Sequence, residues 1–228
     1  MNLTWIKKDT DSWLYKNLFS KDIFSYNDKN TNAIEKISLS TQKMGKQKLW
    51  ERYNQQNAFR LPNQVRTSKK LGNFYSWFTR QYKPEIIVEF GTAFGVSGMY
   101  WLSGIEQNEY GELLTFEPNQ KWASIAAKNL SLIGKRFRLI NGTFEENIED
   151  VLDPLKRINI AFIDAIHTRE FLIPQFELIM KKSKQGSILV FDDISFSEEM
   201  RSCWIEIAND KRVQTSVSID KRIGIVEL

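Results

Sequence analysis

The chain has 228 residues, of which 42% are hydrophobic and 13% aromatic, enough for one substantial core. No apolar run approaches the roughly 20 residues that a membrane-spanning helix needs, and the first ten residues lack the apolar stretch of a signal peptide, so we expect a cytoplasmic protein. The single cysteine, Cys203, excludes an internal disulfide and is expected in a buried helix.

Positive charge is concentrated in the first third of the chain. Residues 1–83 contain 16 Lys and Arg against 6 Asp and Glu, whereas residues 84–228 contain 16 against 22. This asymmetry is compatible with nucleic-acid binding, with an anionic substrate, or with a basic face that docks on an acidic body. It coincides with a change of sequence pattern at Pro84, which divides the chain into a helical N-terminal extension (1–83) and a second domain (84–228).

The extension is predicted to be helical and polar. Its pattern predicts helices near residues 11–19, 32–53 and 68–81, the last with capping signals at Thr67 and Ser68. These helices cannot enclose a core by themselves. The linker 54–63 is a candidate hinge or lid.

From residue 86 onward, short apolar runs alternate with amphipathic stretches, which is typical of βαβ units around a parallel sheet. Strands are predicted at residues 86–90, 113–117, 137–140, 158–164, 187–192, 213–219 and 222–228. Helices are predicted at residues 97–104, 120–131, 168–182 and 197–209. The last two strands flank the turn Asp220-Lys221 and should form an antiparallel hairpin at a sheet edge. The fold class is therefore α/β, a doubly wound, seven-stranded, mainly parallel sheet.

A glycine-rich turn follows the first strand of this sheet. The sequence EFGTAFG (residues 89–95) leads into a helix predicted to start at Ser97. Glycines at such a turn let the backbone approach a ligand, and the helix N-terminus offers free N–H groups to an anion. Three residues separate Gly91 from Gly95, so the spacing differs from the dinucleotide pattern G-x-G-x-x-G and argues against NAD.

The second strand ends in Glu117, at the position where an open α/β sheet places an acid that holds two ribose hydroxyls. A glycine turn and a strand-end acid each occur for structural reasons alone, but together and in this order they indicate a nucleoside site. An adenosine-containing ligand is implied. Trp122, in the helix that follows, is expected to pack in the core.

The pattern Glu-x-Gly-x-x-x-Gly followed by a strand-end acid resembles the first two motifs of class I S-adenosylmethionine-dependent methyltransferases. Residues 88–228 resemble their small-molecule O-methyltransferase branch, which implies a Rossmann-like methyltransferase fold and S-adenosylmethionine as the methyl donor. By this resemblance, the methionine part of the donor would be lined by Glu89, Gly91, Thr92, Gly95 and Ser97, with Glu117 on the ribose and Gly142, Thr143 and Phe144 near the adenine. Asp164 would complete the cofactor site, and Arg66 and Thr67 would contact cofactor or substrate.

Two further strands end in acids. The fourth ends at Asp164, three residues before His167, which is the only histidine, and the fifth ends at Asp192 and Asp193. Because neighbouring parallel strands bring their carboxyl ends to one edge, these side chains should share a crevice with the glycine turn. Three carboxylates would repel one another unless protons or a cation were bound, which favours a hard divalent ion such as magnesium. His167 is the candidate general base for a substrate hydroxyl.

This arrangement is similar to the metal-dependent sugar O-methyltransferases of macrolide biosynthesis, to the cephalosporin-tailoring methyltransferases and to catechol O-methyltransferase. The resemblance implies Asp164, Asp192 and Asp193 as metal ligands, and His167 with Asp164 as catalytic residues. The chain departs from the catechol enzyme in having Asp193 where that enzyme has Asn. Alternatively, Asp193 caps the following turn and His167 caps the helix that starts near Thr168.

The sequence thus predicts an S-adenosylmethionine-dependent O-methyltransferase that acts on a hydroxyl of a small molecule, such as a sugar or a natural product. The basic extension suggests an RNA methyltransferase as a rival, but residues 164–167 read DAIH where enzymes that methylate nucleobase amines often carry an Asn/Asp-Pro-Pro-aromatic loop. A second rival is a non-catalytic scaffold that keeps the cofactor fold. No membrane partner is expected, and exposed N-terminal helices could pair subunits in a homo-oligomer.

Overall fold

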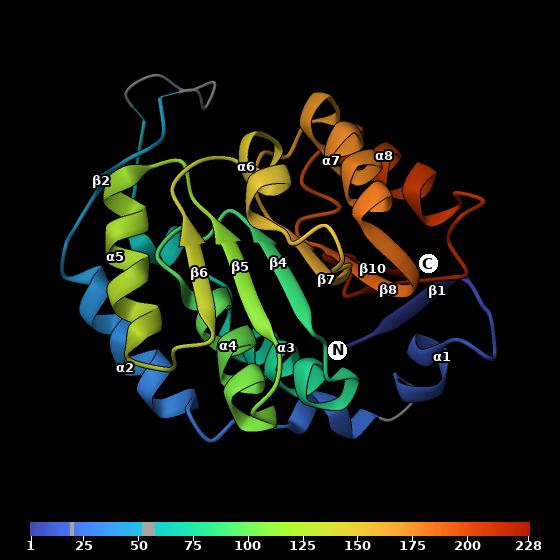
Figure 1. Ribbon diagram of the computed structural model, residues 1–228, viewed down its shortest axis with the longest axis horizontal. Helices are drawn as coiled ribbons and strands as arrows, with labels where there is room; N and C mark the ends of the chain where they lie inside the picture. Colours follow the sequence, from blue (N-terminus) through green and yellow to red (C-terminus); the bar gives the residue numbers. More distant parts are fainter. Residues whose placement is uncertain (19–20, 52–57) are drawn as a thin grey trace.

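An eight-stranded sheet runs through residues 1–18, 21–51 and 58–228, the part of the chain that this computed structural model describes. Its parallel strands, in spatial order, are β6 (Phe137–Ile140), β5 (Glu112–Phe116), β4 (Ile86–Phe90), β7 (Ile158–Ile163) and β8 (Ser183–Phe191). Antiparallel strands continue the sheet in the order β10 (Ile223–Glu227), β9 (Thr215–Ile219) and β1 (Leu3–Lys7). Figure 1 shows β6, β5, β4 and β7 side by side, with β1 toward the other edge. A separate pair joins β2 (Gln47–Lys48) to β3 (Phe59–Arg60).

Helices cover both faces of the sheet, as the doubly wound prediction requires (Figure 1). One face packs against α1 (Trp13–Asn17), α2 (Thr31–Gln42), α3 (Lys69–Tyr82), α4 (Val96–Asn108) and α5 (Gln120–Ser131). The other packs against α6 (Phe144–Val151), α7 (Arg169–Lys182) and α8 (Glu198–Ala208). Short 3₁₀ helices occupy Lys21–Ser25 and Pro62–Gln64. Successive side chains of β4 point to opposite faces of the sheet, so this strand contributes to both hydrophobic cores. Ile87 packs on the first face, and Ile86 and Val88 pack on the second.

Side-chain caps begin most of the helices that surround the parallel strands. The Ser68 hydroxyl accepts the Leu71 N–H at the start of α3, as its sequence predicts, and Thr143 and Ser197 cap α6 and α8 in the same way. Helix α4 differs, because it begins after Gly95 in the left-handed region (φ 84°) with no side-chain cap. Its first N–H groups therefore stay free for a ligand.

The β-strand predictions are confirmed for the parallel core, but the hairpin was wrongly placed at the sheet edge. Strand β1 pairs with β9, with Leu3 opposite Ile219, and so adds an eighth strand outside the hairpin. The helix predicted at 32–53 ends at Gln42, and β2 follows it. Helix α6 was missed. Residue 19 of the first predicted helix and residues 52–57 around the proposed hinge lie outside the described residues.

None of the helices in the described part of the chain is long and apolar enough to cross a membrane.

A buried carboxylate joins the extension to the rest of the molecule. Asp28 precedes α2 and is 1% exposed, and it accepts hydrogen bonds from the hydroxyls of Ser76 on α3 (2.6 Å) and Ser103 on α4 (2.7 Å). The side chain of Gln107 and the N–H of Asn30 also donate to it. This single acid therefore satisfies donors from three helical segments, in a region where unpaired polar groups are costly.

We expect Asp28→Ala to lower the free energy of unfolding by about 3 kcal/mol, because several buried donors would lose their charged acceptor. Urea unfolding followed by circular dichroism measures the change. Asp11→Ala is the matched control, since the Asp11 side chain is 94% exposed and pairs with the exposed Lys16. Equal stability of the two variants would contradict the assigned role of Asp28.

Candidate active site

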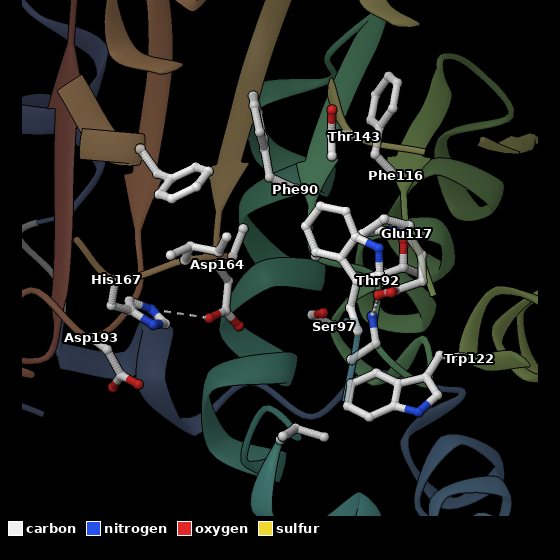
Figure 2. A pocket seen from close by; sticks show the side chains of 18 of the residues that line it. Phe90, Thr92, Ser97, Phe116, Glu117, Trp122, Thr143, Asp164, His167 and Asp193 are labelled. Carbon is white, nitrogen blue, oxygen red and sulfur yellow. Dashed lines mark hydrogen bonds and ion pairs between the residues drawn. The ribbon is translucent and has the colours of Figure 1, made fainter. Parts of the chain in front are cut away.

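A cavity of about 470 Å³ opens at the carboxyl ends of the parallel strands. The ends of β4, β5 and β7 and the starts of α4 and α6 line it, and residues 49–50 and 60–66 of the extension contribute a wall. Figure 2 shows that the cavity has two ends, with Glu117, Thr143 and Trp122 at one and His167 and Asp193 at the other. We call these the Glu117 end and the His167 end.

The turn after β4 fits beside β7 only because residue 91 is glycine. Gly91 has φ 83°, and a Cβ atom there would lie 2.2 Å from the carbonyl oxygen of Asp164. The N–H groups of Gly91 and Thr92 both donate to the carbonyl of Phe116, each at 3.1 Å. The turn is thus fixed between β5 and β7, and Ser97 in the first turn of α4 reaches the cavity.

Glu117 is a buried acid whose orientation is set by backbone groups. It is 5% exposed, and its two oxygens accept the N–H groups of Ala93 and Asn119, each at 2.8 Å. Burial raises the pKa of Glu117 to about 7, even though the two N–H groups favour the ionised form. The carboxyl therefore exchanges its proton near neutral pH while keeping its position.

Glu89 lies beneath the glycine turn, outside the cavity lining. It is fully buried, and Thr115 donates a hydrogen bond of 2.6 Å to Oε2, whereas Oε1 has no partner among the described residues. Burial is the main cause that raises the pKa of Glu89 to about 7, and Asp164 and Glu117 add repulsion. A buried oxygen without a donor is unfavourable, so a proton or a cationic ligand group would stabilise this position.

Aromatic rings surround the Glu117 end. The ring centroids of Phe90 and Phe144 are 4.0 Å apart, and those of Phe94 and Trp122 are 4.6 Å apart. Trp122 was expected only in the core, and the structure shows it buried and lining the cavity as well. These faces offer stacking surface to a planar heteroaromatic ligand.

Asp164 and His167 form the ion pair of the other end. The His167 Nε2 atom lies 3.5 Å from Asp164 Oδ1, and Phe196 packs on the imidazole at 5.3 Å between ring centroids. Burial by itself would lower the pKa of His167, but Asp164, Asp193 and Asp192 outweigh it and raise the pKa. Burial raises the pKa of Asp164 to about 6, with repulsion from Asp192 as the next cause. The two candidate catalytic side chains therefore lie next to each other at this end of the cavity.

Asp192 and Asp193 are bound by an arginine that the sequence analysis overlooked. Arg222 Nε lies 2.8 Å from Asp192 Oδ1, and its Nη2 lies 3.0 Å from Oδ2, a bidentate pair with a carboxylate that is 2% exposed. The same Nε lies 3.2 Å from Asp193 Oδ1. Arg222 also lines the cavity.

The predicted magnesium site is not supported, although Asp164, Asp192 and Asp193 do reach one edge of the sheet. A divalent ion needs several oxygen ligands within roughly 2.6 Å, and both oxygens of Asp192 are already engaged by Arg222. In residues 1–18, 21–51 and 58–228, no group of three His, Cys, Asp or Glu side chains is arranged to hold a metal ion. These residues do not fit the ion that the resemblance implied.

The extension contributes a side wall with a fixed arginine. Arg66 lines the cavity and donates to Glu35 (2.6 Å) and Ser38 (2.8 Å) on α2. Thr67, predicted beside it as a contact, is buried and does not line the cavity. The remaining lining residues of this wall are Leu49, Trp50, Arg60, Gln64 and Val65.

Most predicted site residues meet at this cavity. Those that line it are Gly91, Thr92, Ser97, Glu117, Thr143, Phe144, Asp164, His167 and Asp193. Those that pack outside its lining are Glu89, Gly95, Gly142 and Asp192. Lining residues that sequence reasoning missed include Phe171, Gln175, Phe196 and Arg222. They carry no local motif, since only the tertiary fold brings these helix and loop positions to the strand ends.

Comparison with known proteins identifies the fold. Residues 88–194 match the family model of a methyltransferase domain. No curated protein sequence matches the chain.

Solved structures share the whole architecture at low sequence identity. TomG, an O-methyltransferase of tomaymycin synthesis from Streptomyces achromogenes solved with S-adenosylmethionine, has 17% identity and a TM-score of 0.67, over 90% of this chain and 92% of TomG. An O-methyltransferase from Bacillus cereus solved with S-adenosylhomocysteine has 17% identity and a TM-score of 0.62, over 95% and 96% of the two chains. A methyltransferase from Podospora anserina bound to the same product has 16% identity and a TM-score of 0.64, over 86% and 87%. The chain therefore has a Rossmann-like methyltransferase fold.

The pKa of His167 should lie above the ordinary value of about 6.5, because three carboxylates favour the imidazolium. NMR titration of the imidazole Cε1–Hε1 signal measures this pKa without an assignment problem, since the chain has one histidine. Asp164→Asn should lower the midpoint. Asp153→Asn, at an exposed loop position, should leave it unchanged, and an unchanged midpoint in the Asp164 variant would refute the pair.

Proposed function

We propose that the protein is an S-adenosylmethionine-dependent O-methyltransferase whose acceptor is a hydroxyl of a small molecule. The match to a methyltransferase domain model and the methyltransferase fold support this proposal. One observation carries this proposal: a single cavity holds a backbone-fixed acid, Glu117, at one end and an acid–base pair, Asp164 and His167, at the other. Residues 84–228 would bind the donor, and residues 1–83 would form the extension that encloses the acceptor.

The donor is proposed to lie along the glycine turn. Its ribose hydroxyls would donate to Glu117, and its adenine would pack among Phe144, Thr143 and Trp122. Its methionine part would lie over Gly91, Thr92 and Ser97, with its ammonium group toward Glu89 and Asp164. Gly95 and Gly142 would act indirectly by shaping these turns.

The acceptor is proposed to enter at the His167 end. When bound, S-adenosylmethionine would supply an activated methyl group, which the acceptor oxygen would take as the carbon–sulfur bond breaks and its electron pair stays on sulfur. The Nε2 atom of His167 faces Asp164, which leaves Nδ1 to take the hydroxyl proton. Asp164 and Asp193 would then stabilise the imidazolium, and the same two carboxylates contribute to the raised pKa of His167.

The RNA methyltransferase alternative receives no support from the site. The cavity that holds the proposed base has a mixed lining, in which acids such as Glu145 and Asp193 lie beside aromatic rings and beside Arg60, Arg66 and Arg222. Nucleic-acid sites are instead dominated by Lys and Arg that contact phosphates. A small hydroxylated acceptor fits this mixed lining of acids, arginines and aromatic rings better.

Isothermal titration with S-adenosylhomocysteine tests the cofactor assignment. We expect micromolar affinity at pH 8, falling about tenfold by pH 6, because Glu117 must be ionised to accept the ribose hydroxyls and its pKa is about 7. Protonation of Glu89, whose pKa is also about 7, acts in the same direction. Glu117→Gln should weaken binding and flatten its pH dependence.

Glu112→Gln is the control for this titration, because Glu112 lies at the other end of β5 and pairs with Arg138. It should bind like the wild type. Absence of S-adenosylhomocysteine binding at every pH between 6 and 8 would overturn the proposed function.

His167→Ala should lower the rate of methyl transfer by about 10²- to 10³-fold, the usual contribution of a positioned general base. Transfer of a labelled methyl group from S-adenosylmethionine to hydroxylated sugars and phenols measures the rate. The affinity for S-adenosylhomocysteine should stay within about twofold, since His167 lies at the acceptor end. A parallel loss of rate and affinity would argue that His167 is structural.

A further inference from the structure

Arg222 is held at the acidic edge by the geometry of a tight hairpin. The strands β9 and β10 pair from Ile219 and Ile223 onward, and the turn between them places Asp220 (φ 50°) and Lys221 (φ 57°) in the left-handed region. Arg222 follows directly, its N–H bonded to Ile219 O at 2.9 Å, and its carbonyl accepts the N–H of Ile194 at 3.0 Å. Both the hairpin and the loop after β8 therefore fix this arginine.

The guanidinium fills the position between two acids with a permanent positive charge. Its bidentate contact uses both oxygens of the buried Asp192 carboxylate, and Asp193 approaches the same nitrogen. These contacts raise the pKa of Arg222 further above its already high ordinary value, so it stays charged at any pH of use. Two carboxylates beside one another are thus neutralised in part without an added ion.

We infer that Arg222 takes the place of a divalent metal ion at this edge, so that the protein carries its own fixed cation and works without a metal. The part of this inference that concerns the reaction rests on the proposed methyltransferase function. Its structural part stands separately, because the occupation of Asp192 by Arg222 is independent of what the cavity binds.

The three acids would therefore have different roles in the reaction. Asp192 and Asp193 hold Arg222, while Asp164 remains paired with His167 and free to orient the base. The Arg222 side chain is 43% exposed and lines the cavity, so its positive charge also faces the acceptor side. A positive charge there favours the developing negative charge on a hydroxyl that loses its proton, which is a task that a metal ion performs elsewhere.

Titration with Mn²⁺ alone tests the inference on the intact protein. The wild type should show no saturable binding up to about 1 mM Mn²⁺, because the ion would have to displace a bidentate guanidinium. Arg222→Gln should release Asp192 and Asp193 and bind Mn²⁺ at least about tenfold more tightly than the wild type. Wild-type binding in the micromolar range, or no gain in the variant, would overturn the inference.

Arg212→Gln is the matched control, because Arg212 makes an equivalent bidentate contact with Glu177, away from the cavity, and also pairs with Asp210. It should bind no Mn²⁺. Arg222→Lys keeps the charge and should also remain without metal affinity, and circular dichroism verifies that each variant is folded. The wild-type titration decides the inference even if Arg222→Gln does not fold.

The same samples separate this inference from the proposed function. S-adenosylhomocysteine binding tests the proposed function. If S-adenosylhomocysteine does not bind, the proposed function fails, whereas the Mn²⁺ titration still tests whether Arg222 occupies the position of a metal ion. If S-adenosylhomocysteine binds, its affinity and the rate of methyl transfer should be unchanged in excess EDTA. A loss of more than about tenfold in the rate on chelation would contradict a metal-free edge.

Discussion

The crowding of carboxyl groups at one buried edge of the sheet is the constraint on which the site depends. Parallel strands bring Glu89, Glu117, Asp164 and Asp192 to the same end of the fold, and burial makes each negative charge costly. The protein resolves this in two ways. Asp192 receives the guanidinium of Arg222, whereas the pKa values of Glu89 and Glu117 rise to about 7 and that of Asp164 to about 6. Each of these raised pKa values is caused mainly by burial, which disfavours a negative charge at this edge of the sheet.

The N-terminal end of the chain supports the residue that neutralises Asp192. Strand β1 pairs with β9, and the N–H of Asn2 donates to the Asp220 side chain at 2.7 Å while the Asp220 N–H returns a bond of 2.9 Å to Asn2. These contacts hold the strained turn that precedes Arg222. A segment more than 200 residues away in sequence thus helps to set the charge balance of the cavity.

The sequence was sufficient to predict what local patterns encode. Apolar runs predicted the parallel strands. The glycine turn and Glu117 predicted the place of the cavity, because the carboxyl ends of parallel strands meet at one edge of the sheet.

The sequence was not sufficient to predict partners that meet only through the tertiary fold. Arg222 lies beside a polar turn and pairs with an acid 30 residues earlier, so it resembles an ordinary surface residue in the sequence. The magnesium prediction failed for this reason: repulsion among acids requires a cation, but the sequence does not say which one. Strand β1 was missed because it is short and forms only by pairing with β9, which lies far away in the sequence.

An acid and apolar side chains, rather than an array of basic residues, make the main described contacts of the extension with the rest of the molecule. Asp28 bonds to residues of α3 and α4, α3 packs on α4 through apolar side chains, and Lys7 donates to the carbonyls of Asp210 and Val213. Arg66 is likewise paired within the extension, with Glu35, and that glutamate also accepts the hydroxyl of Tyr100 on α4. The part of the wall that Arg66 forms is therefore anchored to the same helix that begins at the glycine turn. Another part of the wall, Leu49 and Trp50, follows β2, and the carbonyl of Lys48 accepts a hydrogen bond of 3.0 Å from the side chain of Asn119, so this part borders the Glu117 end of the cavity.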